Sequence, residues 1–198
     1  MTNPIISDEA LGIIFRNARS FDEYTDKPVS DVTLRAAYDL YRYGPTSANC
    51  SPTRIIFLKS DAAKERLRPC LSDINVDKVL AAPVTALISY DTQFYELLPQ
   101  LFPSQPTARS WFDGDVDVAN ITAFRNGTLQ GAYFIIAARA VGLDCGPMSG
   151  FDNAAADAEF HPEGQIKSNF LCTLGYGDPT NLIERSPRPD FDQICEIS

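Results

Sequence analysis

The chain has 198 residues, 44% of them hydrophobic and 22% charged, a composition typical of a globular protein with a buried core. Its 26 acidic and 17 basic side chains give a formal net charge of −9. Nucleic acids and anionic membranes are bound through basic surfaces, so this charge argues against both as the main partner. A small anion held by a few local cations is not excluded.

Hydrophobic periodicity predicts helices and short strands in one domain over residues 1–198, which indicates an α+β class. Ser30 is a suitable N-cap for the second helix, whose apolar stripe is Leu34, Ala37, Tyr38 and Tyr41. Helices are expected over residues 10–19, 31–43, 61–71, 75–80, 117–141 and 152–160. Strands are expected over residues 54–59, 84–90, 143–150 and 170–174, the third including a turn.

Residues 91–116 follow neither the helical nor the strand pattern of hydrophobic residues. Pro99, Pro103 and Pro106 lie here among aromatic and leucine side chains. A segment this apolar needs a surface to pack on, so we expect a lid-like excursion that covers another part of the molecule.

The segment Gly44–Pro52 is a polar loop directly before the first strand. Pro45 and Pro52 fix the backbone at both ends, and small hydroxyl side chains and Asn49 lie between them. Such a loop can present hydroxyl, amide and backbone groups to a flat polar ligand. The alternative is an ordinary turn with an Asn or Ser cap.

No self-sufficient catalytic machinery is visible in the sequence. The single histidine, His161, would have to serve any Ser-His or Cys-His arrangement, and we expect it in a polar surface loop without a catalytic role. Dinucleotide-binding, Walker and zinc-protease motifs are absent. An enzyme of this composition would have to take its chemistry from a cofactor.

The cysteines and the N-terminus bear on metal binding and location. Five cysteines without a Cys-x-x-Cys pair, and a single histidine, give no support for a zinc site, so we predict no metal. Free thiols and a start at Met1–Ile6 without a signal-peptide pattern indicate a cytoplasmic protein.

Several basic and amide side chains could bind a polar ligand. Arg19-Ser20 and the later Arg185 and Arg188 could hold phosphate oxygens, because a guanidinium fork matches two of them. Asn75 and Lys78 share one helical face and could donate to the edge of a polar ring. Each of these residues could equally be a solvated surface group.

Five segments in order carry a resemblance to a known family: Gly44–Pro52, Ala108–Phe112, Ala123–Asn126, Gly146–Asp152 and Leu174–Asp178. Together they resemble the flavin-dependent nitroreductase family over nearly the whole chain, and more narrowly its malonic semialdehyde reductase branch in pyrimidine breakdown. The resemblance implies a central, mostly antiparallel sheet flanked by helices. It also implies an intertwined homodimer with FMN at the subunit interface.

The same resemblance assigns roles to individual residues. It places Arg19, Ser20, Arg185 and Arg188 at the FMN phosphate. Asn75 and Lys78 meet the pyrimidine edge of the flavin, and the turn of Pro147, Met148, Ser149 and Gly150 faces N5 and O4. The partner's loop contributes Pro45, Thr46, Ser47 and Asn49. Asp22, Glu23, Ser51 and Thr53 depart from the family pattern, the first two standing where basic residues often occur.

The implied function is an FMN-dependent oxidoreductase that takes electrons from NADPH or NADH. The favoured reaction is reduction of malonic semialdehyde to 3-hydroxypropanoate by ping-pong hydride transfer through flavin N5, with no catalytic side chain. Arg109, Arg125 and Lys78 are candidates to hold the substrate's negative charge. The alternatives are a broad nitro- or quinone reductase and a non-catalytic dimeric binding protein.

Overall fold

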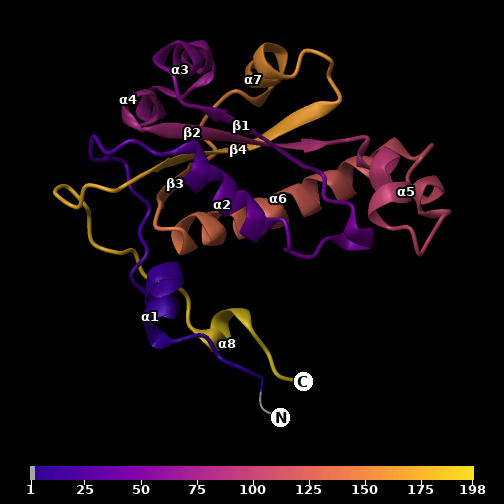
Figure 1. The fold of residues 1–198 in the computed structure, drawn as a ribbon, viewed down its shortest axis with the longest axis horizontal. Helices are drawn as coiled ribbons and strands as arrows, with labels where there is room; N and C mark the ends of the chain where they lie inside the picture. The colour runs from indigo at the N-terminus through magenta and orange to yellow at the C-terminus, as the bar shows by residue number, and fades with distance from the viewer. Residues whose placement is uncertain (1–2) are drawn as a thin grey trace.

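A four-stranded antiparallel sheet forms the centre of the computed structural model, which describes residues 3–198 (Figure 1). The strands are β1 (Thr53–Leu58), β2 (Val84–Asp91), β3 (Asp144–Met148) and β4 (Ile166–Gly175), in the order β1-β2-β4-β3. All neighbouring strands pair antiparallel, with Ile56 opposite Leu87 and Cys145 opposite Leu174. The predicted mostly antiparallel sheet is confirmed.

Helices cover both faces of this sheet (Figure 1). One face carries α2 (Asp31–Tyr41) and the long α6 (Val116–Ala140); the other carries α3 (Asp61–Leu67), α4 (Asp73–Ala81) and α7 (Asn153–Phe160). Short helices complete the fold: α1 (Asp8–Leu11), α5 (Leu98–Leu101) and α8 (Phe191–Ile194). Each face has its own core, around Phe134 beneath α6 and around Leu87 and Val79 beneath α4.

Local sequence signals explain where the main helices begin and end. The Ser30 hydroxyl accepts from Thr33 N at 3.0 Å and caps α2 as predicted. Gly142, at φ 84°, follows the end of α6 in the left-handed region that glycine tolerates. Within α6, Gly131 allows close packing on the sheet, because a Cβ there would lie 2.6 Å from the Phe170 ring.

Residues 91–116 form a separate packed unit rather than a loose loop. Their buried aromatic and aliphatic side chains contact the first half of α6 and the loop before β1. The cluster contains Cys50, Phe94, Leu98, Ala108, Phe112, Ala119 and Ala123. The excursion therefore covers Cys50 and the N-terminal half of α6.

Four sequence expectations need correction. The helix expected over residues 10–19 is α1 followed by a π-helical turn that ends at Arg16. The helix expected to reach residue 71 changes after Leu67 to a 3₁₀ turn that contains Pro69. β4 begins four residues early, at Ile166, because the polar residues 167–169 hide the strand pattern. Tyr38, expected in the core stripe, is 46% exposed.

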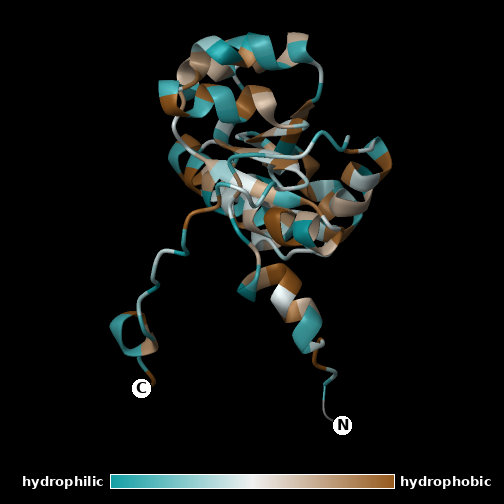
Figure 2. Ribbon diagram, turned by 90° about the vertical axis from the view of Figure 1, so that its left-hand side faces the viewer, coloured by the Kyte–Doolittle hydropathy of each residue, from teal (hydrophilic) through white to brown (hydrophobic). Residues whose placement is uncertain are grey.

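The two ends of the chain leave the body as separate arms (Figure 2). They are tied together at their bases, where Arg185 Nη2 donates to Arg16 O at 3.0 Å and to Ala18 O at 2.6 Å. Within residues 3–198 no helix combines the length and apolar character needed to cross a bilayer.

Candidate functional site

Four arginines meet at a hollow of about 410 Å³ where the two arms join the body. Three of them come from the expected positions, and the fourth, Arg139, lies in the last turn of α6. The hollow is lined by Phe15, Ala18, Arg19, Ser20, Arg139, Ile183, Glu184, Arg185, Ser186 and Arg188. A concentration of guanidinium groups in a chain of net charge −9 is suited to an anion.

Hydrogen bonds to main-chain carbonyls orient these arginines. Arg19 Nη2 donates to Ile183 O, and Arg188 Nη1 donates to Ser186 O at 3.0 Å. Among residues 3–198, none of the four arginines has a carboxylate partner within 4.0 Å. Their positive charge therefore remains available to a bound anion.

Arg139 was not identified from the sequence. Its Nη1 donates to Ile14 O at 3.1 Å, while its Nε is buried without a protein partner. Buried donors are normally satisfied, so this Nε is suited to a ligand oxygen. A basic residue in the last turn of a helix is an ordinary feature, so nothing in the local pattern marks Arg139 as a ligand-binding residue.

Asn75 on α4 fixes the turn after β3. Its Nδ2 donates to Gly150 O at 2.9 Å, and the same carbonyl accepts from Ser72 N at 3.1 Å. A Cβ on Gly150 would lie 2.5 Å from Asn75 Nδ2, so the contact requires glycine here. Asn75 is buried, so its side chain is held in place and is not part of the solvent-exposed face of α4. We refer to Asn75 and the turn that it holds as the Asn75–Gly150 wall.

Lys78 lies one helical turn after Asn75 and forms an ion pair with Asp22, Nζ to Oδ2 2.8 Å. Asp22 follows Ser20 and Phe21, which run beside β3: Phe21 N donates to Cys145 O at 3.2 Å. The arginine hollow, α4 and the residue 147–150 turn therefore lie at one end of the molecule.

The loop with Pro45, Thr46, Ser47 and Asn49 lies at the other end, near α5 (Figure 1). Ser47 N donates to Asn126 Oδ1 at 2.9 Å, and Asn49 Nδ2 donates to Leu101 O at 2.6 Å. Ala48, Asn49 and Ser51 have φ of 49°, 52° and 40°, in the left-handed region. Within one chain this loop is not brought to Lys78 or to the arginines.

The sequence profile described as the Nitroreductase family matches residues 15–177.

The chain belongs to the nitroreductase family.

Curated relatives of this nitroreductase-family chain are similar along their whole length. A provisionally named NADH dehydrogenase/NAD(P)H nitroreductase of Cupriavidus pinatubonensis is 55% identical over 194 residues, which are 97% of this chain and 99% of the relative. The relative HadB of Ralstonia pickettii, with the same description, is 54% identical over 191 residues, covering 96% and 97%. These names support the family and do not mention malonic semialdehyde.

Solved structures of the family share the fold. A nitroreductase of Bacillus subtilis, ydfN, superposes with a TM-score of 0.87 at 19% identity, covering 97% of this chain and 100% of that one. A nitroreductase of Exiguobacterium sibiricum, solved in complex with FMN, gives 0.85 at 17% identity, covering 100% of both chains. The predicted nitroreductase-like fold is confirmed.

The substrate candidates differ in their surroundings. Arg109 is bound to two carboxylates, at 2.7 Å to Glu96 Oε1 and also to Asp113. Arg125 forms no ion pair within residues 3–198. It borders a shallow hollow of about 620 Å³ lined by Tyr90, Asn120, Ile121, Phe124, Arg125 and Thr128.

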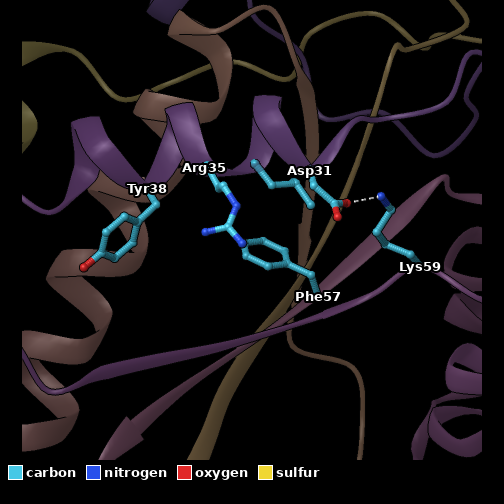
Figure 3. Close-up of a pocket in the computed structure, with 6 residues that line it drawn as sticks. Asp31, Arg35, Tyr38, Phe57 and Lys59 are labelled. Carbon is cyan, nitrogen blue, oxygen red and sulfur yellow. Dashed lines mark hydrogen bonds and ion pairs between the residues drawn. The ribbon is translucent and has the colours of Figure 1, made fainter.

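A further hollow of about 500 Å³ lies between α2 and β1 (Figure 3). Arg35 and Phe57 face it, and Asp31 pairs with Lys59 at its rim. It contains no residue predicted for the site.

The sequence predicted His161 in a polar surface loop, and this prediction is wrong. His161 is buried, with 6% exposure. Its Nε2 lies 2.9 Å from Ser89 Oγ, beneath α7. Burial lowers the pKa of this imidazole, because the charged form loses hydration. No group of three or more potential metal ligands occurs within the described residues.

Proposed function

We propose that this chain is an FMN-dependent oxidoreductase that uses NADPH or NADH. The observation that carries the proposal is a direct link between two polar regions: Ser20 lines the four-arginine hollow, and Asp22, two residues on, is ion-paired with Lys78 on α4. This arrangement suits a phosphate joined to a flat polar ring. Support also comes from the relatives named NAD(P)H nitroreductases and from the FMN complex of the Exiguobacterium sibiricum protein.

The phosphate of FMN would bind in the hollow. Arg19, Arg185 and Arg188 provide forked donors, Ser20 adds a hydroxyl, and Arg139 offers its unpaired Nε. Charge-assisted bonds from guanidinium to phosphate are among the stronger hydrogen bonds in proteins. The structure therefore fits the anionic end of this cofactor.

The flavin ring would lie against α4 and the turn after β3. Asn75 and Lys78 would meet its pyrimidine edge, and Pro147, Met148, Ser149 and Gly150 would approach N5 and O4. Ser149 and Gly150 are the small residues of this turn and leave room for a ring face. Bound FMN would supply the two-electron hydride carrier that no side chain of this protein provides.

We propose a homodimer that completes each site. The partner's Pro45, Thr46, Ser47 and Asn49 would reach the flavin, since the loop of the same chain lies at the far end. Large apolar side chains are exposed on the arms and on α6, where water would otherwise contact them. They include Ile13, Phe15, Ile121, Phe124, Leu129, Ile183, Phe191, Ile194 and Ile197.

Malonic semialdehyde is the proposed acceptor. NAD(P)H loses a hydride and becomes NAD(P)⁺, the aldehyde carbon gains that hydride, and its oxygen takes a proton, which gives 3-hydroxypropanoate. The substrate carboxylate needs a cation, and Arg125 is the candidate without a competing carboxylate in the described chain.

An uncharged nitro or quinone acceptor is the second candidate. Arg109 and Lys78 are already paired with acidic side chains, which leaves less positive charge for an anionic substrate. A flat aromatic acceptor requires stacking area rather than a cation.

A flavin titration and a turnover comparison test these proposals. The purified protein should bind FMN at one per chain, with flavin absorbance bands, and should oxidise NADPH or NADH when an acceptor is present. Absence of FMN binding would rule out the function.

Comparing the turnover of malonic semialdehyde with that of a nitroaromatic, using the same electron donor, separates the two acceptors. Arg125→Gln should raise KM for the aldehyde acid selectively.

A further inference from the structure

An ion pair crosses the edge of the proposed flavin site. Lys78 Nζ lies 2.8 Å from Asp22 Oδ2, joining α4 to the segment that follows Arg19 and Ser20. The Lys78 side chain is 32% exposed and that of Asp22 63% exposed. Both charged groups therefore have contact with solvent, so a ligand lying against α4 can meet them.

We infer that Asp22 tunes the reduction potential of the bound flavin by partly neutralising Lys78. This inference rests on the proposed function. Two-electron reduction adds negative charge to the pyrimidine side of the ring, and an unpaired ammonium there would stabilise that charge. With Asp22 attached, the carboxylate offsets part of the ammonium's charge, and the remainder still acts on the ring. FMN would then be held at a lower potential, which favours hydride transfer to the acceptor.

The neighbouring acidic residue has a different environment. The Glu23 carboxylate accepts from Asn181 Nδ2 at 3.1 and 3.0 Å, on the C-terminal arm rather than on α4. Glu23 O also accepts from Asp178 N at 3.0 Å. Glu23→Gln is thus a matched control, because it removes the same charge one residue away without freeing Lys78.

The experiment uses the FMN-loaded full chain. Wild type, Asp22→Asn, Glu23→Gln, Lys78→Met and the double variant Asp22→Asn/Lys78→Met are titrated with FMN by fluorescence. Their midpoint potentials are then measured by absorbance against reference dyes. Thermal melting of each apoprotein checks that the variants fold.

In Asp22→Asn, the ratio of the affinity for reduced FMN to the affinity for oxidised FMN should rise about tenfold. For a two-electron couple this corresponds to a midpoint potential about 30 mV more positive. Glu23→Gln should change this ratio less than threefold, and Lys78→Met should shift it in the opposite direction. In the Lys78→Met background Asp22→Asn should change the ratio less than threefold, because the more exposed Asp22 carboxylate is itself screened by solvent.

An unchanged potential in Asp22→Asn, with FMN bound, overturns the inference and leaves the proposed function standing. An equal shift in both backgrounds shows that Asp22 acts directly on the flavin, which also overturns it. Failure of wild type to bind FMN overturns the proposed function and this inference together.

Discussion

His161 is the single histidine of the chain, and it is buried against Ser89. Because burial lowers its pKa, His161 stays neutral in the native protein at pH values where it is already protonated in the unfolded chain, just below about pH 6.5. Below that pH the unfolded state binds more protons, so the free energy of unfolding should fall as the pH decreases. The loss is at most about 1.4 kcal/mol per pH unit.

Urea denaturation at pH 7.5 and pH 5.5 measures this dependence. His161→Gln should show a smaller loss between the two pH values than wild type, although it is less stable at pH 7.5 because the imidazole packing is lost. An identical pH dependence in the two proteins would contradict the assignment to His161.

Arg139 gives a second test at the scale of one residue. Arg139→Gln should weaken FMN binding about tenfold, because it removes a charged donor set from the phosphate hollow. Riboflavin, which lacks the phosphate, should bind equally well to the variant and wild type. Arg42→Gln, at the exposed arginine that follows α2 as its C-cap, is the control and should affect neither ligand. Equal weakening of FMN and riboflavin would place Arg139 outside the phosphate site.

The sequence predicted part of this chemistry, and for identifiable reasons. Asn75 and Lys78 are an i, i+3 pair, so a helix necessarily places them together. Arg19, Arg185 and Arg188 were named from the match of guanidinium to phosphate and again from the family resemblance, and the structure brings them to one hollow. The position of Arg139 in the hollow depends on where α6 ends against the N-terminal arm. The ion pair between Asp22 and Lys78 depends on packing between segments far apart in sequence.

At the scale of elements, α6 and the sheet are in close contact through glycine. Gly131→Ala should destabilise the fold by about 1–3 kcal/mol, since the added Cβ would meet the Phe170 ring. Helix propensity alone predicts the opposite, a gain of about 1 kcal/mol. Ala132→Gly, at the next and exposed position, is the control and should lose about 1 kcal/mol from propensity. Chemical denaturation measures both; a stabilised Gly131→Ala would show that the contact is not tight.

The periodicity of hydrophobic residues predicted the ends of α2, α6 and β2 to within a few residues. Each of these elements buries one or both of its faces, which makes its pattern clear. β4 was predicted too short, because Lys167, Ser168 and Asn169 give no strand pattern although Ser168 is buried and hydrogen-bonded. The π-helical turn at Gly12–Arg16 has no local signal and depends on the packing of the N-terminal arm.

At the scale of the whole molecule, the loop before β1 and the Asn75–Gly150 contact lie at opposite ends of one chain (Figure 1). Helix and strand periodicity could not reveal this separation, and only the family resemblance assigned the loop to a partner's site. A second copy is the proposed solution, and the exposed apolar face of α6 is where it would pack. Ile121 is 57% exposed and Phe124 52%. Contiguous apolar surface of this kind is typical of an interface.

Ile121→Glu should therefore convert a dimer into a monomer, because a carboxylate at a packed apolar interface loses hydration without gaining a partner. Ala154→Glu adds the same charge on α7, on the opposite face of the sheet, and should leave the dimer intact. Sedimentation at several protein concentrations measures the association. FMN affinity should fall together with dimerisation in Ile121→Glu, since each flavin would lose the partner's loop. A monomeric variant that binds FMN as tightly as wild type would mean that one chain supplies the complete site.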